Sequence, residues 1–114
     1  MLITALAVAA AISGTQPAIK QCSINNAEFE DCLVLVKREN NVTAIGVQFL
    51  TFDGKMVLAG NTIDNSKFQV RALAVADSPA VEAEGYCQAF TDAGFVRCSY
   101  TFQGASQVYT LTIR

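Results

Sequence analysis

The sequence predicts an all-β domain with two disulfides and about seven strands, either an antiparallel β-sandwich of the immunoglobulin-like or a similar kind, which we favour, or a small barrel. Three observations lead to this prediction. Short stretches of alternating apolar and polar residues recur along the chain, Gly, Asn and Asp residues separate them, and four cysteines occur within 114 residues. Beyond the first 18 residues, no stretch has the periodicity of an amphipathic helix.

The N-terminal stretch predicts an export signal. Residues 1–12 are apolar and uncharged, and small residues follow that suit cleavage. We therefore assign residues 1–18 to a signal peptide with cleavage near 13–18, Ser13 or Gly14 being the favoured position, and 19–114 to a single β domain. The pattern departs from the usual one because no Lys or Arg precedes Lys20. The apolar run is shorter than the roughly 18 residues that span a bilayer, so no stable membrane anchor is expected after cleavage.

The cysteines support the same compartment. In a short exported chain, Cys22, Cys32, Cys87 and Cys98 are expected to form two disulfides, which fits a secreted or periplasmic protein. Four cysteines allow three pairings, and we favour Cys22 with Cys32 and Cys87 with Cys98 because each pair is close in sequence. The absence of His and of any CxxC motif argues against a metal site.

The stretch from Tyr86 to Phe102 predicts a β-hairpin. Val96, Cys98, Tyr100 and Phe102 alternate with polar residues and should face the core. A loop over 91–94 pairs Phe90 with Phe95 and places Cys87 opposite Cys98, within reach of a disulfide. The competing three-residue loop over 92–94 would put the two sulfurs on opposite faces.

Other strands and turns follow from the same rules. Residues 20–31 are expected to form an irregular loop with a turn at Asn25-Asn26, residues 60–67 a second loop, and residues 77–84 a connection between sheets. Turns are predicted at Asn40-Asn41 and Asp53-Gly54. The remaining expected strands are residues 32–38, 42–52, 55–59, 67–75 and 107–113.

Family resemblance is slight. The stretch from Val47 to Val57, a strand followed by an Asp-Gly turn and a return strand, resembles hairpins of exported immunoglobulin-like modules. This resemblance covers little of the chain and implies only the sandwich fold. The chain shows no convincing match to the motif of the periplasmic lysozyme inhibitors, and we recognise no family.

The composition argues against most catalytic chemistry. Without His there is no Ser-His-Asp triad and no Cys-His pair. Glu82 and Glu84 could form a carboxylate pair of the glycosidase type if their stretch is extended. The acidic residues Glu28, Glu30 and Asp31 could attract Ca²⁺, but they lack EF-hand spacing. We predict a non-enzyme without a cofactor or metal.

The expected function is an exported binding module whose partner is a protein or peptide, which includes inhibitors of lytic enzymes or proteases. The net charge of −2 without a basic cluster argues against nucleic-acid binding. The predicted hairpin places Tyr86, Phe90, Phe95 and Arg97 on its outward face, and aromatic and Arg residues are enriched at interface hot spots. Alternatively, the 20–31 loop covers this face, or Phe90 and Phe95 stabilise the hairpin as a cross-strand pair. The alternative functions are a carboxylate-dependent hydrolase and a structural or assembly subunit.

Overall fold

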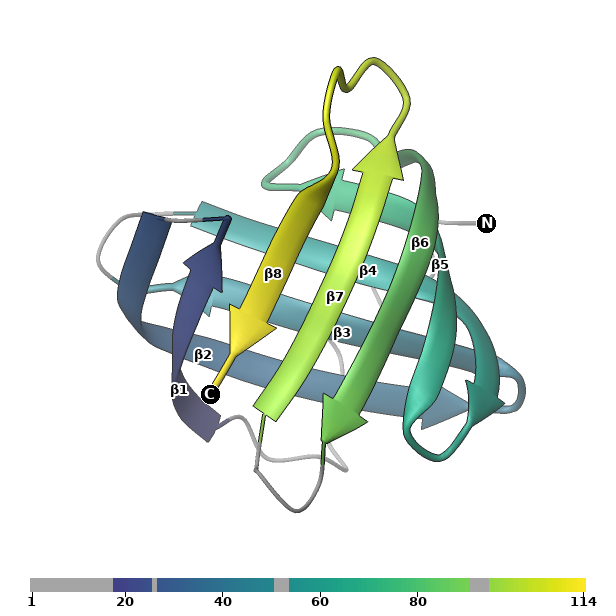
Figure 1. The fold of residues 1–114 in the computed structure, drawn as a ribbon, viewed down its shortest axis with the longest axis horizontal. Helices are drawn as coiled ribbons and strands as arrows, with labels where there is room; N and C mark the ends of the chain where they lie inside the picture. The colour runs from purple at the N-terminus through teal and green to yellow at the C-terminus, as the bar shows by residue number, and fades with distance from the viewer. Residues whose placement is uncertain (1–17, 26, 51–53, 91–94) are drawn as a thin grey trace.

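The fold is an eight-stranded antiparallel β-barrel, shown in Figure 1. The computed structural model describes residues 18–25, 27–50, 54–90 and 95–114. Its strands are β1 (Ala18–Ile24), β2 (Ala27–Glu39), β3 (Val42–Phe49), β4 (Gly54–Asp64), β5 (Lys67–Val75), β6 (Val81–Phe90), β7 (Phe95–Phe102) and β8 (Tyr109–Ile113). Each strand pairs with the next one along the chain, and β8 pairs with β1 to close the barrel. The expected signal peptide lies almost entirely outside the described residues.

The favoured sandwich is therefore wrong and the small barrel, the less favoured alternative, is the fold, whereas the all-β antiparallel class and the two disulfides are confirmed. In Figure 1, β6, β7, β8 and β1 cross in front of β2, β3 and β4, so the barrel has two layers, as a sandwich does. Both architectures need strands with one apolar face. They differ in how the layers connect, which alternation within a strand does not encode.

Closure of the barrel depends on a segment that the sequence predicted to be irregular. Residues 20–31 form most of β1 and the start of β2, which pair as a hairpin from Ile24 and Ala27 outwards. The turn residue Asn25 has a φ of 55°, in the left-handed region that Asn tolerates. Its backbone N–H donates to the carbonyl of Thr110 (2.8 Å), and its side-chain oxygen accepts from the N–H of Thr110 (2.9 Å). Asn25 thus ties β1 to β8 at the seam.

Three further loop and strand predictions need correction. The strand predicted over 42–52 ends at Phe49, and β4 continues to Asp64 where a loop over 60–67 was expected. The connection after β5 joins it directly to its neighbour β6, which begins at Val81, so it does not carry the chain between sheets. The predicted turn at Asn40-Asn41 is confirmed, whereas Asp53 of the Asp53-Gly54 turn lies outside the described residues.

The short turn between β4 and β5, which replaces the loop predicted over 60–67, is stabilised by Asp64. Its carboxylate oxygen Oδ1 accepts hydrogen bonds from the backbone N–H of Ser66 (2.8 Å) and from its hydroxyl (2.9 Å). These bonds, the backbone one first, lower the pKa of Asp64 because they stabilise the ionised form. One Asx-type turn is therefore enough to reverse the chain between β4 and β5.

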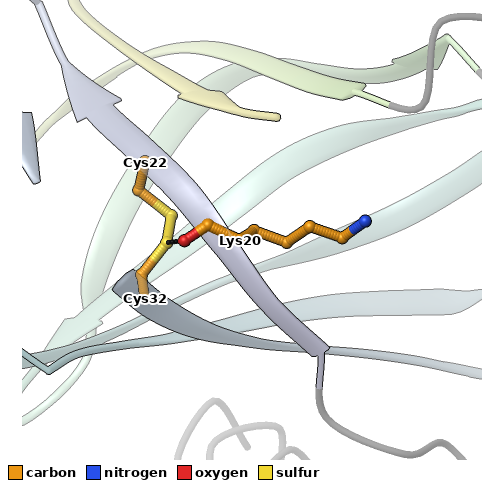
Figure 2. Close-up of a disulfide and its surroundings, with 3 residues drawn as sticks. All are labelled: Lys20, Cys22 and Cys32. Carbon is orange, nitrogen blue, oxygen red and sulfur yellow. Dashed lines mark hydrogen bonds between the residues drawn. A yellow bond between two sulfur atoms is a disulfide. The ribbon is translucent and has the colours of Figure 1, made fainter. Parts of the chain in front are cut away.

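Both favoured disulfides are confirmed. Cys87 and Cys98 lie directly opposite each other with their Cα atoms 4.0 Å apart, in the register that also pairs Phe90 with Phe95. Cys22 and Cys32 have Cα atoms 6.1 Å apart and are not directly paired, because β1 and β2 shift register between Lys20 and Cys22. In Figure 2 the Cys32 sulfur points to the carbonyl oxygen of Lys20, 3.3 Å away. A disulfide sulfur carries no proton, so this is a close sulfur–oxygen contact.

Apolar side chains fill the barrel. The buried core includes both disulfides together with residues from all eight strands, among them Leu58, Val70 and Leu111 at 0% exposure. As predicted, Cys98 and Tyr100 are buried, and Val96 and Phe102 pack against this core from partly exposed positions. An eight-stranded barrel has an interior just wide enough for such side chains. The interior of this barrel is therefore a packed core.

A bulge changes the facing of residues within β5. Strict alternation along 67–75 predicts that Phe68, Val70, Ala72 and Ala74 share one face, opposite Leu73. Phe68 and Val70 do face the core, but beyond the bulge Leu73 joins the core cluster and the two alanines do not. The register of β5 with β4 and with β6 shifts near Arg71, and an extra residue reverses the phase of the side chains that follow. Alternation thus predicts facing only up to a bulge.

An aromatic cluster lies inside the barrel on β7 and β8. The Tyr109 ring stacks on Phe102 with centroids 5.4 Å apart and on Tyr100 with centroids 6.0 Å apart. Burial, with a smaller contribution from Tyr109, raises the pKa of Tyr100 from 10.0 to about 12. The folded chain therefore holds this proton to a higher pH than the unfolded chain does.

We expect this difference to weaken the fold at alkaline pH. Because the unfolded chain loses the Tyr100 proton near pH 10.0 and the folded chain near 12, the free energy of unfolding should fall as pH rises through that interval. The slope from one proton is at most about 1.4 kcal/mol per pH unit. Urea unfolding at about pH 9 and pH 11 should show a smaller loss for Tyr100→Phe than for the wild type. Tyr86→Phe, which removes an exposed phenol, should keep the wild-type loss, and equal losses in all three proteins would contradict the assignment.

Candidate interaction surface

The outer face of β5, β6 and β7 combines an aromatic ring with basic and amide side chains. Register brings these positions side by side, since Lys67 pairs with Gln88, Gln69 with Tyr86, Tyr86 with Ser99 and Gln88 with Arg97. Their strand neighbours Phe68, Cys87 and Cys98 face the core. The β5–β7 surface is defined here as Lys67, Gln69, Tyr86, Gln88, Arg97 and Ser99.

Tyr86 lies at the centre of this surface. Its side chain is 47% exposed, and the ammonium nitrogen of Lys67 lies 4.5 Å from the centre of its ring. A cation within about 6 Å of an aromatic face is attracted by the ring quadrupole. The Lys67 contact therefore favours one orientation of the exposed ring and presents a positive charge beside it.

Two of the four residues predicted for this face can be placed. Tyr86 and Arg97 are exposed on the outer face, as the hairpin register requires. The backbones of Phe90 and Phe95 pair with each other, but their side chains lie outside the described part of the structure. The structure does not test their contribution to the surface or as a cross-strand pair.

The alternative in which residues 20–31 cover this face is wrong. These residues belong to β1 and β2, which form part of the barrel wall and pair with β8 and β3. The β5–β7 surface keeps Tyr86 about half exposed. A cover over this face was considered because residues 20–31 were predicted to be an irregular loop. They instead form most of β1 and the start of β2.

Lys67 and Gln69 belong to this surface but were not among its predicted members. Both are on the polar side of the alternating pattern in β5, so their outward facing could be read from the sequence. Their position beside Tyr86 could not, because it depends on the pairing of β5 with β6. A hairpin signal between those strands would have been needed, and the chain has Asp77-Ser78-Pro79 there instead.

The predicted carboxylate pair does share a face. Glu82 and Glu84 are both exposed on β6 and line a depression of about 290 Å³ together with Ala83, Thr101, Phe102 and Gln103. An acid catalyst of the glycosidase type is usually held against apolar groups. Here both carboxylates are open to solvent, so the arrangement is that of a solvated rim.

The acidic residues predicted as a possible Ca²⁺ site form no metal site among the side chains that the structure describes. Glu28 and Asp31 are exposed, and the side chain of Glu30 is outside the description. Within the described ranges, no group of three or more His, Cys, Asp or Glu side chains could hold a metal ion. Nor does any helix among these residues have the length and apolarity to cross a bilayer.

No family model, curated protein or solved structure matches the chain.

Proposed function

We propose that this chain is an exported binding module that recognises a protein or peptide through the β5–β7 surface. The observation that carries the proposal is the exposed Tyr86 ring under the Lys67 ammonium, next to Arg97. Tyr and Arg supply much of the binding energy in protein interfaces, because each combines a large contact area with polar groups. Inhibition of a lytic enzyme or protease is one form that such binding would take.

The distribution of charge along β6 suggests how a bound partner is oriented on this surface. The exposed side chains along this strand run from Glu82 and Glu84 to Tyr86 and Gln88, and the basic residues Lys67 and Arg97 flank the latter end. The surface thus changes from acidic to basic around Tyr86. A partner with carboxylates near Lys67 and Arg97 would complement it, and this complementarity would fix its orientation.

The scaffold supports export and a binding role. All four cysteines are oxidised, which is compatible with an oxidising compartment outside the cytoplasm. Assembly by strand addition requires an open sheet edge. Every described strand already has a neighbour on each side, so side-chain recognition on the outer surface is the better-supported mode.

Binding should depend on Tyr86 and Arg97 far more than stability does. We expect the double variant Tyr86→Ala, Arg97→Glu to bind its partner at least about 30-fold more weakly, the loss that accompanies removal of about 2 kcal/mol of hot-spot energy. Tagged wild type, used to capture proteins from the exported fraction, identifies the partner, and titration calorimetry with that purified partner measures the affinities. Thermal unfolding measures the stability of each variant.

The matched control is Val108→Asp, which changes a residue that is 62% exposed outside this surface. It should bind like the wild type. Equal affinities of the wild type and the double variant would refute the proposal, as would a collapse of the double variant's melting temperature, because the surface would then be part of the structural core.

A further inference from the structure

The depression on β6 and β7 lies at the end of the barrel where β7 runs into its connection to β8. It has a volume of about 290 Å³ and is lined by Glu82, Ala83, Glu84, Thr101, Phe102 and Gln103. Register brings these residues together, since Ala83 pairs with Phe102 and Glu84 with Thr101. The depression therefore belongs to two neighbouring strands whose relative position is fixed by their pairing.

Backbone hydrogen bonds fix its rim. The N–H of Gln103 donates to the carbonyl of Glu82 (2.9 Å), which extends the pairing of the two strands past the last residue of β7. The N–H of Ala105 then donates to the carbonyl of Phe102 (2.9 Å) and closes a turn. The Phe102 ring is itself held in its stack on Tyr109. A ligand would therefore enter a site that is already formed, with little cost in ordering the chain.

The lining combines two carboxylates with apolar groups. Glu82 and Glu84 share a face of β6 because they are two residues apart, which places them about 7 Å from each other along the strand. Among the described residues, neither carboxylate forms an ion pair. Ala83 and Phe102 supply the apolar part of the lining. A basic side chain matches this combination, because its alkyl stem packs on apolar groups while its charged end stays at the carboxylates.

Arginine suits this site better than a metal ion does. A planar guanidinium carries several N–H donors and can bond two carboxylates at once. Calcium takes roughly six to eight oxygen ligands, more than two exposed carboxylates supply. Within the part of the chain that the structure describes, no group of three or more His, Cys, Asp or Glu side chains could hold a metal.

The depression continues into the β5–β7 surface. Along β6, Tyr86 follows Glu84 on the same outward face. Gln88 comes next and lies in register between Lys67 and Arg97. The depression and this basic pair are about 17 Å apart, the length of roughly five extended residues. A segment of a partner that crosses Tyr86 therefore reaches both.

We propose that the depression receives an arginine side chain of the bound partner, from an extended segment whose acidic residue, about five positions away, lies at Lys67 and Arg97. The inference rests on the proposed function and adds the chemistry that orients the partner. Opposite charges at two separated points favour one direction of binding and oppose the reversed one.

A free arginine side chain tests the depression without the partner. N-acetyl-arginine amide is titrated into the isotope-labelled full chain and followed by backbone amide chemical shifts. N-acetyl-citrulline amide, which has nearly the same shape and no charge, is the control probe. We expect the arginine probe to shift the amides of residues 82–84 and 101–103 at least about three-fold more than the citrulline probe does. The double variant Glu82→Gln, Glu84→Gln should abolish this difference.

The matched control is Glu28→Gln, Asp31→Asn, which removes the same charge from exposed residues of β2 outside the depression. Asn tolerates the left-handed φ of 55° at Asp31. This variant should keep the wild-type response to the arginine probe. Equal shifts with the two probes, or equal responses of the two double variants, would overturn the inference.

The captured partner provides the second test. Glu82→Gln, Glu84→Gln should weaken its binding by about ten-fold, because charge-assisted hydrogen bonds are lost. A partner whose affinity falls with Tyr86→Ala, Arg97→Glu but not with the glutamine variant would overturn the arginine site and leave the proposed function standing. Failure of the proposed function itself gives a different result, an unchanged affinity of the Tyr86→Ala, Arg97→Glu protein.

Discussion

Replacing Gly85 by alanine is expected to lower the free energy of unfolding by about 3 to 5 kcal/mol, through backbone strain and overpacking together. Gly85 has a φ of 148°, which L residues rarely adopt. An added Cβ would also lie 2.0 Å from the carbonyl oxygen of Ser99 and 2.6 Å from the Cα of Tyr100. Both are backbone atoms of β7, so relief would require β6 and β7 to separate, and the Cys87–Cys98 disulfide opposes that movement.

Two other glycines separate strain from collision. Gly104 has a φ of 90°, but nothing lies within 4 Å of its added Cβ, so Gly104→Ala carries the strain alone. At Gly60 an added Cβ would lie 1.7 Å from the carbonyl oxygen of Gln69, so Gly60→Ala tests collision with the backbone. Urea unfolding followed by circular dichroism should rank Gly104→Ala as the mildest of the three. A Gly85→Ala protein as stable as Gly104→Ala would show that β6 and β7 separate easily.

Removing the Cys87–Cys98 disulfide by changing both residues to alanine should cost about 3 kcal/mol. The bond closes a short loop, since the two cysteines are 11 positions apart, and so it restricts the unfolded chain. Both side chains are at most 1% exposed, so their truncation also leaves space in the core. A domain of this size has only about 5 to 15 kcal/mol of stability in total, so the melting temperature should fall sharply.

The second disulfide is the natural comparison, because Cys22 and Cys32 are 10 positions apart and close a loop of similar length. Changing both to alanine should produce a loss of similar size, and wild type unfolded in a thiol reductant should show the combined effect. Ser99→Ala, beside Cys98 on the exposed side of β7, should change stability by less than about 0.5 kcal/mol. A loss under about 1 kcal/mol for the Cys87 and Cys98 variant would mean that residual local structure already restricts this hairpin in the unfolded chain.

The candidate surface was half predictable. Parity on a single hairpin placed Tyr86 and Arg97 outward, because residues two apart in a strand share a face and the Cys87–Cys98 bond requires one register. Lys67, whose ammonium contacts the Tyr86 ring, lies on a different strand, β5. That contact depends on which strands are neighbours, and the Asp77-Ser78-Pro79 connection carried no hairpin signal.

The features that are local in the chain could be predicted from the sequence. Spacing and alternation were enough to predict the β class, both disulfide pairs, the Phe90–Phe95 register and the inward facing of Cys98 and Tyr100, because each depends on residues within one strand or one hairpin. Closure of the barrel through β1 and β8 and the reversal of facing at Leu73 appear only in the tertiary structure. These features depend on pairing and contacts between segments far apart in the chain, for which local periodicity carries no signal.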